Sequence, residues 1–228
     1  MMAAVDDGIG QIVEALEKHD IADDTVIFFA SDNGAPYQNG KPESEMPASL
    51  LDNLDGWDGS LNTPLKGEKG MLAEGGIRVP FVAWGPGRVK AAQVIDAPVI
   101  TLDIAATITA MAGADSKQLD GVDLSTLFAG NAMPTLAERP LFWRFGGADA
   151  IRIGPWKLLR APDGAHYLFD VSISEPESEN LIKQNPERAA ELAAKLDTWT
   201  ATLDQRGTVS RAQLKTTSAR MKRHFPEP

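Results

Sequence analysis

The chain has 228 residues, of which 43% are hydrophobic, and it carries a formal net charge of −10 at pH 7. Its length and apolar content allow one large domain or two small ones, and the acidic balance argues against a nucleic-acid-binding surface. No apolar run reaches transmembrane length, and the first residues lack the basic and apolar regions of a signal peptide. Because the sequence contains no cysteine, disulfides and thiolate metal sites are excluded.

The first two predicted elements form a helix–strand unit of the kind that builds α/β folds. Residues 1–20 place apolar side chains at helical spacing, which predicts an amphipathic helix. The run Thr25–Ala30 is filled with β-branched and aromatic residues and predicts a strand that is buried on both faces. It is followed by Ser31-Asp32-Asn33-Gly34, at the end of the strand where ligands of α/β folds collect.

Asp32 and Asn33 are adjacent oxygen donors of the type that a hard cation such as Ca²⁺ prefers. The same Asp-Asn-Gly sequence is also an ordinary turn, because Asx side chains bond their own backbone and glycine tolerates positive φ. A calcium ion takes about six to eight oxygen ligands, so a metal site here needs further ligands from elsewhere. From these residues alone, both interpretations stand.

A polar stretch, residues 37–60, separates this turn from the next recognisable pattern. Loops of this length are uncommon unless they serve as lids or contact substrates. Tyr37 and Trp57 are the candidate substrate-binding residues within it, since either ring stacks on a sugar or an aryl group. The alternative is a surface excursion that packs on its own apolar side chains.

Two motifs follow, namely Asn62-Thr63-Pro64-Leu65-Lys66-Gly67-Glu68-Lys69-Gly70 and Glu74-Gly75-Gly76-Ile77-Arg78-Val79-Pro80. Together with Ser31-Asp32-Asn33-Gly34 they resemble the sulfatase family of the alkaline-phosphatase-like superfamily. The pattern of that family is S-D-N-G, then N-x-P-L-[RK]-G-x-K-G and E-G-G-[IV]-R-V-P. The match is specific because it fixes several residue types in order over about fifty positions.

The resemblance implies roles for three residues. Asp32 and Asn33 fall on the family's second pair of calcium ligands. Lys69 falls on the lysine that contacts the sulfate group, which makes it both a catalytic and a substrate-binding candidate. A divalent cation and an ammonium placed there would stabilise the charge that grows on the leaving oxygen as the S–O bond breaks. Without the motif, Lys69 would count as a solvated loop lysine, and we take residues 74–78 as a tight structural turn.

Other parts of the family's pattern do not occur here. The sulfatase nucleophile is a formylglycine, made from Cys or Ser in a C/S-x-P-x-R motif, and the chain has no such motif. The family's first pair of acidic calcium ligands belongs to the same missing half. Asp6 and Asp7 do not replace that pair, because they begin a helical pattern rather than end a strand. We therefore expect the chain to be the C-terminal portion of a sulfatase, with the remaining ligands and the formylglycine in an N-terminal half.

The remainder of the first domain contains a second strand and a helix. Val79–Trp84 is a second candidate core strand, which we expect to run parallel to the first. Thr101–Met111 predicts a helix, on which the resemblance gives Asp103 and Thr107 a structural role. Two parallel strands do not make a covered sheet. We therefore expect residues 1–138 to be the rear part of an alkaline-phosphatase-like α/β sandwich.

A small C-terminal subdomain is predicted over residues 139–206. Turn residues separate its four strand candidates, which are Leu141–Phe145, Ala150–Ile153, Trp156–Arg160 and His166–Val171. Asn185-Pro186-Glu187 predicts a helix start with a capping Asn, and the apolar spacing that follows predicts packing on the small antiparallel sheet. Residues 207–228 carry five Lys or Arg and one acid, which predicts a flexible basic tail with the charge to lie on the acidic body of the chain.

The resemblance implies a sulfuric ester hydrolase that acts on sulfated carbohydrates or aryl sulfates when complete, with one Ca²⁺ ion as cofactor. It favours a periplasmic or secreted protein, and the sequence does not set the oligomeric state. The isolated chain is expected to be inactive and to bind calcium weakly at best. One alternative is a non-catalytic module that binds sulfated glycans or pairs with a separate front half. Another is a phospho- or phosphonate-monoester hydrolase of the same superfamily, although no histidine lies between Asp32 and Arg78.

Overall fold

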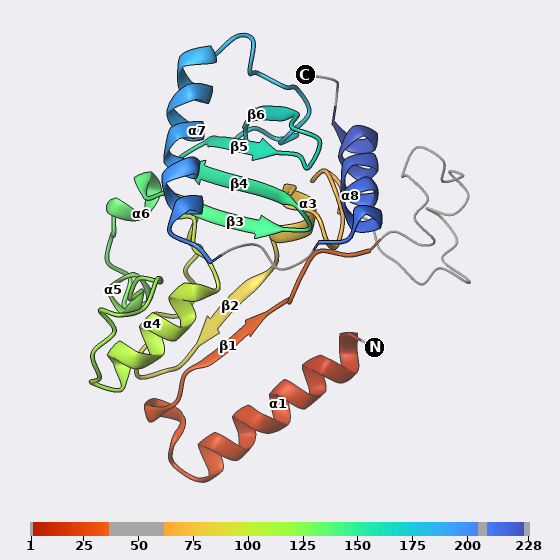
Figure 1. Ribbon diagram of the computed structural model, residues 1–228. Helices are drawn as coiled ribbons and strands as arrows, with labels where there is room; N and C mark the ends of the chain where they lie inside the picture. The colour runs from red at the N-terminus through yellow and green to blue at the C-terminus, as the bar shows by residue number, and fades with distance from the viewer. Residues whose placement is uncertain (1, 37–61, 205–208, 226–228) are drawn as a thin grey trace. The chain divides into compact units, whose positions relative to one another are not determined.

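The computed structural model describes residues 2–36, 62–204 and 209–225 (Figure 1). The chain divides into two compact units, one with residues 1–30 and 80–138 and the other with residues 31–79 and 139–228. The second unit thus combines the Asp32 turn and both motifs with the C-terminal sheet. Among the described residues, no helix combines the length and the apolar character needed to cross a membrane.

The first unit contains a long N-terminal helix, a pair of strands and several shorter helices. Its elements are α1 (Met2–Lys18), η1 (Ala22–Asp24), β1 (Ile27–Ala30), β2 (Phe81–Trp84), α4 (Leu102–Met111), α5 (Ser125–Phe128) and α6 (Thr135–Glu138). The two predicted helices and the two predicted strands are therefore present. A small core forms where the rings of Phe28, Phe81 and Phe128 meet, with centroids 5.8 to 6.5 Å apart.

The expectation that the two strands run parallel is wrong. β1 and β2 pair antiparallel, with Ile27 opposite Trp84 and Ala30 opposite Phe81. The chain therefore leaves β1 and re-enters β2 at the same end of the pair. An apolar run predicts burial but carries no information on strand direction, which depends on the connection. The strands are also largely half-buried rather than covered on both faces.

Asp103 and Thr107 have the structural role that was expected of them. The Asp103 carboxylate accepts hydrogen bonds from Ile100 N and Val122 N, both 2.9 Å long. The Thr107 hydroxyl donates to the Asp103 carbonyl (2.6 Å) and accepts from Leu124 N (2.9 Å). These two buried side chains of α4 therefore fix the segments before and after the helix.

The second unit is built on a four-stranded antiparallel sheet, in the order β3-β4-β5-β6. Its strands are β3 (Leu141–Phe145), β4 (Ala148–Ile153), β5 (Trp156–Arg160) and β6 (His166–Asp170). This confirms the four predicted strands. Gly146 and Gly147 join β3 to β4 with φ of +57° and +87°. That two-residue turn requires positive φ at both positions and matches the twist of the strands it connects.

One face of this sheet is covered by α7 (Pro186–Ala201), as predicted. Leu192 and Leu196 of the helix pack with Leu158 and Leu168 of the sheet, and all four are buried. The predicted capping role of Asn185 is wrong, because its side chain caps no helical N–H and its Nδ2 donates instead to Leu181 O. The helix begins at Pro186 because proline needs no hydrogen-bond partner at the first helical position.

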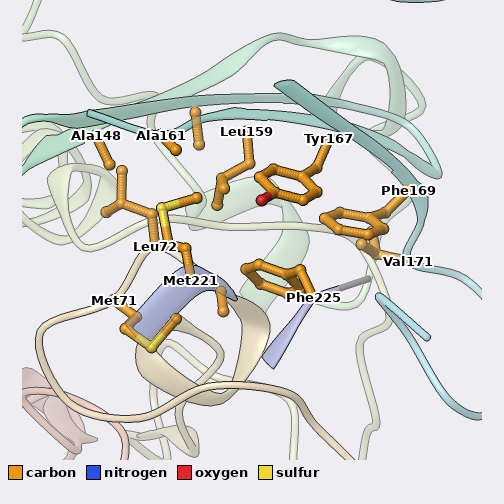
Figure 2. Close-up of a cluster of buried hydrophobic side chains, with 12 residues drawn as sticks. Met71, Leu72, Ala148, Leu159, Ala161, Tyr167, Phe169, Val171, Met221 and Phe225 are labelled. Carbon is orange, nitrogen blue, oxygen red and sulfur yellow. The ribbon is translucent and has the colours of Figure 1, made fainter. Parts of the chain in front are cut away.

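The other face packs against the motif segment and the last helix, α8 (Arg211–His224), as Figure 2 shows. The short helix α3 (Glu74–Ile77) stands where the sequence predicted a tight turn. The cluster on this face comprises Met71, Leu72, Ala73, Ala148, Ala150, Leu159, Ala161, Tyr167, Phe169, Val171, Met221 and Phe225. The second unit therefore has an apolar layer on each side of its sheet.

The expectation of a flexible basic tail is wrong over the described part of residues 207–228. Ser210 begins α8 with a capping box, in which Gln213 N donates to Ser210 Oγ and Ser210 N donates to Gln213 Oε1. Met221 and Phe225 then fall one turn apart on the buried face. The position of the helix is therefore set by Met221 and Phe225 rather than by its basic residues.

Candidate functional site

A set of hydrogen bonds joins the turn after β1 to the two motifs. Gly34 N donates to Gly76 O (3.0 Å), and Lys69 N donates to Ala35 O (3.2 Å). The Asn62 side chain accepts from Ala35 N through Oδ1 and donates to Ala35 O through Nδ2, both at 2.9 Å. We call these bonds among residues 34, 35, 62, 69 and 76 the motif clamp.

The backbone segments joined by the motif clamp approach each other closely because glycines lie where they meet. A Cβ added to Gly34 would lie 1.7 Å from Gly75 O, and one added to Gly76 would lie 2.2 Å from Met71 O. No side chain fits in those spaces, so only bare backbone allows the segments to meet. The three candidate residues Asp32, Asn33 and Lys69 are thereby placed on neighbouring backbone segments of one unit.

Asp32 and Asn33 offer two oxygen donors, the Asp32 carboxylate and Asn33 Oδ1. Asp32 is exposed and Asn33 is half-buried. Asn33 Nδ2 donates to Gly34 O (3.2 Å), and Ser31 Oγ donates to Asn33 O (2.8 Å), so the turn is fixed by its own side chains while Asn33 Oδ1 takes no part in these bonds. Carboxylate and amide oxygens are suitable ligands for Ca²⁺.

The donor set is nevertheless incomplete within the part of the chain that the structure describes. Over residues 2–36, 62–204 and 209–225, no group of three or more His, Cys, Asp or Glu side chains is arranged to hold a metal ion. Asp32 and Asn33 together offer two side-chain oxygen donors, which is fewer than a calcium ion takes. Tyr37 and Trp57, the candidate substrate-binding residues, lie outside the described residues.

Lys69 is exposed, and the peptide units before and after it are both hydrogen-bonded. Its N–H donates to Ala35 O within the motif clamp, and its carbonyl accepts from Arg220 Nη1 at 3.3 Å. The neighbouring Glu68 is only 3% exposed and forms an ion pair with Arg220 Nε at 3.3 Å. Sequence reasoning missed Arg220, because nothing in the local pattern of residues 207–228 links it to a motif 151 residues earlier.

A buried charge cluster lies behind the second motif. Lys157 Nζ donates to Glu74 Oε1 at 2.8 Å and to Glu177 Oε1 at 2.9 Å. Glu74 N also donates to Glu177 Oε2 at 2.9 Å, and Arg152 lies 3.9 Å from Glu74. Lys157 is completely buried on β5, between apolar neighbours. The cluster therefore attaches the start of α3 to the sheet and to the loop that carries Glu177.

The pKa values of this cluster follow from burial and from the opposing charges. Burial raises the pKa of Glu177, and the nearby Glu74 carboxylate raises it further. Burial also opposes ionisation of Glu74, but Lys157 and Arg152 outweigh it and lower the pKa of that carboxyl. Burial alone would lower the pKa of Lys157, yet Glu177 and Glu74 raise it above its ordinary value. Lys157 therefore stays charged inside the protein.

Sequence reasoning treated Glu74 as structural, which this cluster confirms, but assigned no role to Lys157 or Glu177. The available signal was a lysine within the strand pattern Trp156–Arg160, flanked by apolar residues. Lysine is almost never fully buried unless it is paired. A partner was therefore to be expected, although its identity depends on contacts 83 and 20 residues away along the chain.

Comparisons with known proteins identify the family to which the chain belongs. A sequence model of the sulfatase family matches residues 1–114, which is half of the chain. Human N-acetylgalactosamine-6-sulfatase is 36% identical over 146 residues, which cover 62% of this chain and 24% of that protein. Human steryl-sulfatase is 34% identical over 131 residues, which cover 56% and 21%. The chain thus spans about a quarter of the length of these curated relatives.

A solved structure agrees with these sequence relatives. The crystal structure of Ps i-CgsB in complex with k-i-k-neocarrahexaose is 28% identical to this chain and superposes with a TM-score of 0.72. The superposition covers 97% of this chain and 46% of that one, so both units have counterparts in it. On this evidence the chain belongs to the sulfatase family and has the alkaline-phosphatase-like fold of that family.

Proposed function

We propose that this chain forms part of the active site of a sulfuric ester hydrolase, in which Asp32 and Asn33 bind a divalent cation and Lys69 binds the sulfate group. The single observation that carries the proposal is the motif clamp, which joins the Asp32 turn to the Lys69 segment by hydrogen bonds of 2.9 to 3.2 Å. Such a clamp supplies the fixed backbone on which positioned charges depend.

The residues of the chain would bind and orient the ester. The Lys69 ammonium, exposed on a clamped turn, would donate hydrogen bonds to a sulfate oxygen and offset its negative charge. The Asp32 carboxylate and Asn33 Oδ1 would hold Ca²⁺, which supplies electrophilic stabilisation of the sulfate oxygens when it is bound. The nucleophile and the remaining calcium ligands would come from residues other than these 228, consistent with the resemblance to formylglycine-dependent enzymes.

Carbohydrate sulfate esters are the substrate class that we propose. Among the similar proteins, one is named for N-acetylgalactosamine 6-sulfate and another was crystallised with a neocarrahexaose. Steryl-sulfatase, a third relative, makes non-carbohydrate esters the alternative. Because one fold hosts many substrates, a choice between the two classes depends on the residues that contact the group beyond sulfur.

The proposal is tested by titrating one sample of the ¹⁵N-labelled chain with CaCl₂ and a separate sample with Na₂SO₄, while amide and lysine side-chain resonances are recorded by NMR. We expect saturable shifts at Asp32 and Asn33 with calcium and at Lys69 with sulfate. Affinities in the millimolar range are sufficient for this measurement. Asp32→Ala should abolish the calcium response, and Lys69→Ala should weaken sulfate binding at least about tenfold.

Two matched variants control for general charge effects. Asp23→Ala removes another exposed acid, from η1, and Lys117→Ala removes an exposed lysine from the loop after α4. Both should leave the two responses unchanged. Equal losses in these controls, or the absence of any saturable shift at Asp32 and Lys69, would contradict the proposed site.

Turnover provides a second test. The chain alone should not hydrolyse an aryl sulfate such as 4-methylumbelliferyl sulfate in the presence of Ca²⁺, because it has no formylglycine motif. Hydrolysis by the purified 228-residue chain would show that its nucleophile lies among its own residues. This would overturn the proposal that the nucleophile comes from other residues.

A further inference from the structure

Helix α8 places a second cation, Arg220, in contact with the Lys69 segment. Its apolar anchors Met221 and Phe225 are 2% and 3% exposed, and the Phe225 ring lies 5.3 Å from Tyr167 and 5.1 Å from Phe169, centroid to centroid. Figure 2 shows the Phe225 ring beside Tyr167 and Phe169, with Met221 in the same buried cluster. The helix position is therefore set by apolar contacts, and Arg220, the residue before Met221, is carried to a defined place.

The Arg220 side chain contacts the Lys69 segment at several points. Nη1 donates to Lys69 O at 3.3 Å, and Nε pairs with Glu68 Oε1 at 3.3 Å. A Cβ added to Gly70 would lie 3.2 Å from Arg220 Nη1, so the guanidinium group occupies the space beside that glycine. One planar group thus reaches both Glu68 and Lys69, which suits the fixed fork of arginine.

These contacts have a consequence for Lys69. Glu68 is buried and adjacent in sequence, and an unbalanced carboxylate there would compete with any anion for the Lys69 ammonium. The ion pair with Arg220 balances that charge. The hydrogen bond to Lys69 O holds the peptide unit after Lys69, and the motif clamp holds the unit before it. Together they restrict the volume that the long lysine side chain samples.

We infer that Arg220 is a positioning residue for Lys69, which it acts on through the backbone of residues 68–70 and through the charge of Glu68. The inference rests on the function proposed for Lys69. It also assigns α8 to the working part of the site, although no motif includes this helix.

The test compares Arg220→Ala with Lys222→Ala in the full 228-residue chain. Lys222 lies on the same helix and carries the same charge, but it pairs with Asp163 and not with the Lys69 segment. Two quantities are measured for each variant: the affinity for inorganic sulfate, from the Lys69 side-chain resonances, and the ¹⁵N order parameters of residues 68–70. We expect Arg220→Ala to weaken sulfate binding about three- to tenfold and to lower the order parameters, while Lys222→Ala leaves both unchanged.

Arg220→Lys separates charge from geometry. It keeps a cation beside Glu68 but lacks the fork that also reaches Lys69 O, so it should restore part of the sulfate affinity and little of the backbone order. It also preserves most of the side-chain stem, which keeps the test valid if Arg220→Ala loosens α8.

The outcomes distinguish this inference from the proposed function. Wild-type affinity and order in both Arg220 variants would overturn the inference, and so would an equal loss in Lys222→Ala. If sulfate shifts no Lys69 resonance even in the wild type, the proposed function fails. The order parameters of residues 68–70 still decide whether Arg220 holds the turn in that case.

Discussion

Strands β1 and β5 are both short, yet their surroundings differ. On β5, Leu158 packs under α7 and Leu159 packs against the motif segment, and the two are 0% and 1% exposed. Among the described residues β1 pairs with β2 alone, and Val82 on that strand is 54% exposed. An apolar strand is therefore buried only where other elements supply a layer for each face.

The same contrast separates the helices of the two units. Leu192 and Leu196 of α7 are completely buried against the sheet. None of the side chains of α1, all of which the structure describes, is buried, although the helix is amphipathic. Ile12 on its apolar face is 55% exposed. We therefore expect the second unit to hold most of the free energy of unfolding that the chain has, and local opening to occur first in α1.

The largest expected effect comes from the buried charge cluster. Lys157→Met should lower the free energy of unfolding of the second unit by about 3–5 kcal/mol, because it leaves the Glu74 and Glu177 carboxylates buried without their shared cation. Urea denaturation followed by tryptophan fluorescence measures this loss. Lys195→Ala, on the exposed face of α7, should cost less than about 0.5 kcal/mol. Similar losses in both variants would show that the cluster adds nothing beyond ordinary surface charge.

A pair of core substitutions tests the contrast between the units directly. Leu192→Ala should cost about 2–5 kcal/mol, since it opens a cavity under the sheet. Ile12→Ala on α1 should change the free energy of unfolding by less than about 0.5 kcal/mol. Thermal unfolding measures both, and hydrogen exchange should show slower exchange in β4 and β5 than in α1. Equal losses of stability in the two variants would contradict the expected difference between the units.

The motif clamp should respond to removal of a single side chain. Asn62→Ala deletes hydrogen bonds to Ala35 N, Ala35 O and Gly67 O, and should destabilise the second unit by about 1–3 kcal/mol. It should also weaken the calcium response of Asp32, because the turn loses its attachment. Asn131→Ala, an exposed asparagine in the first unit, is the matched control. An unchanged calcium response in Asn62→Ala would contradict a positioning role for the clamp.

The smallest expected effect is a pH dependence from His166 on β6. Burial and then the Arg160 charge lower the pKa of this half-buried imidazole. The folded state therefore binds fewer protons than the unfolded state, so stability is lost as the pH falls below about 6.5. His166→Asn should flatten the stability profile between pH 7.5 and 5.5, which urea denaturation at each pH measures. Parallel profiles for wild type and His166→Asn would contradict this assignment.

Local patterns predicted most of the second unit. The four strands and α7 are marked by short apolar runs and by turn residues, which act over a few positions along the chain. Features that depend on distant partners were not predictable in this way. The antiparallel pairing of β1 and β2 depends on a connection of residues 31–79, and the buried position of Lys157 depends on Glu74 and Glu177.

The motifs predicted the candidate site residues, but they did not predict the residues that hold them in place. Asp32, Asn33 and Lys69 remain predictions as ligands, and Tyr37 and Trp57 lie outside the described residues. The hydrogen-bonding role of Asn62 and the reach of Arg220 were invisible in the sequence, because each joins segments that are far apart along the chain. A capping box at Ser210 and the spacing of Met221 and Phe225 were the readable signs that the tail folds.

The two hydrogen bonds between Asn62 and Ala35 join the chain to itself across 27 positions, at the base of the excursion between them. The entropic cost of closing such an excursion grows only slowly with its length. We therefore expect the length of the sequence between these two residues to have little effect on stability while the two hydrogen bonds remain.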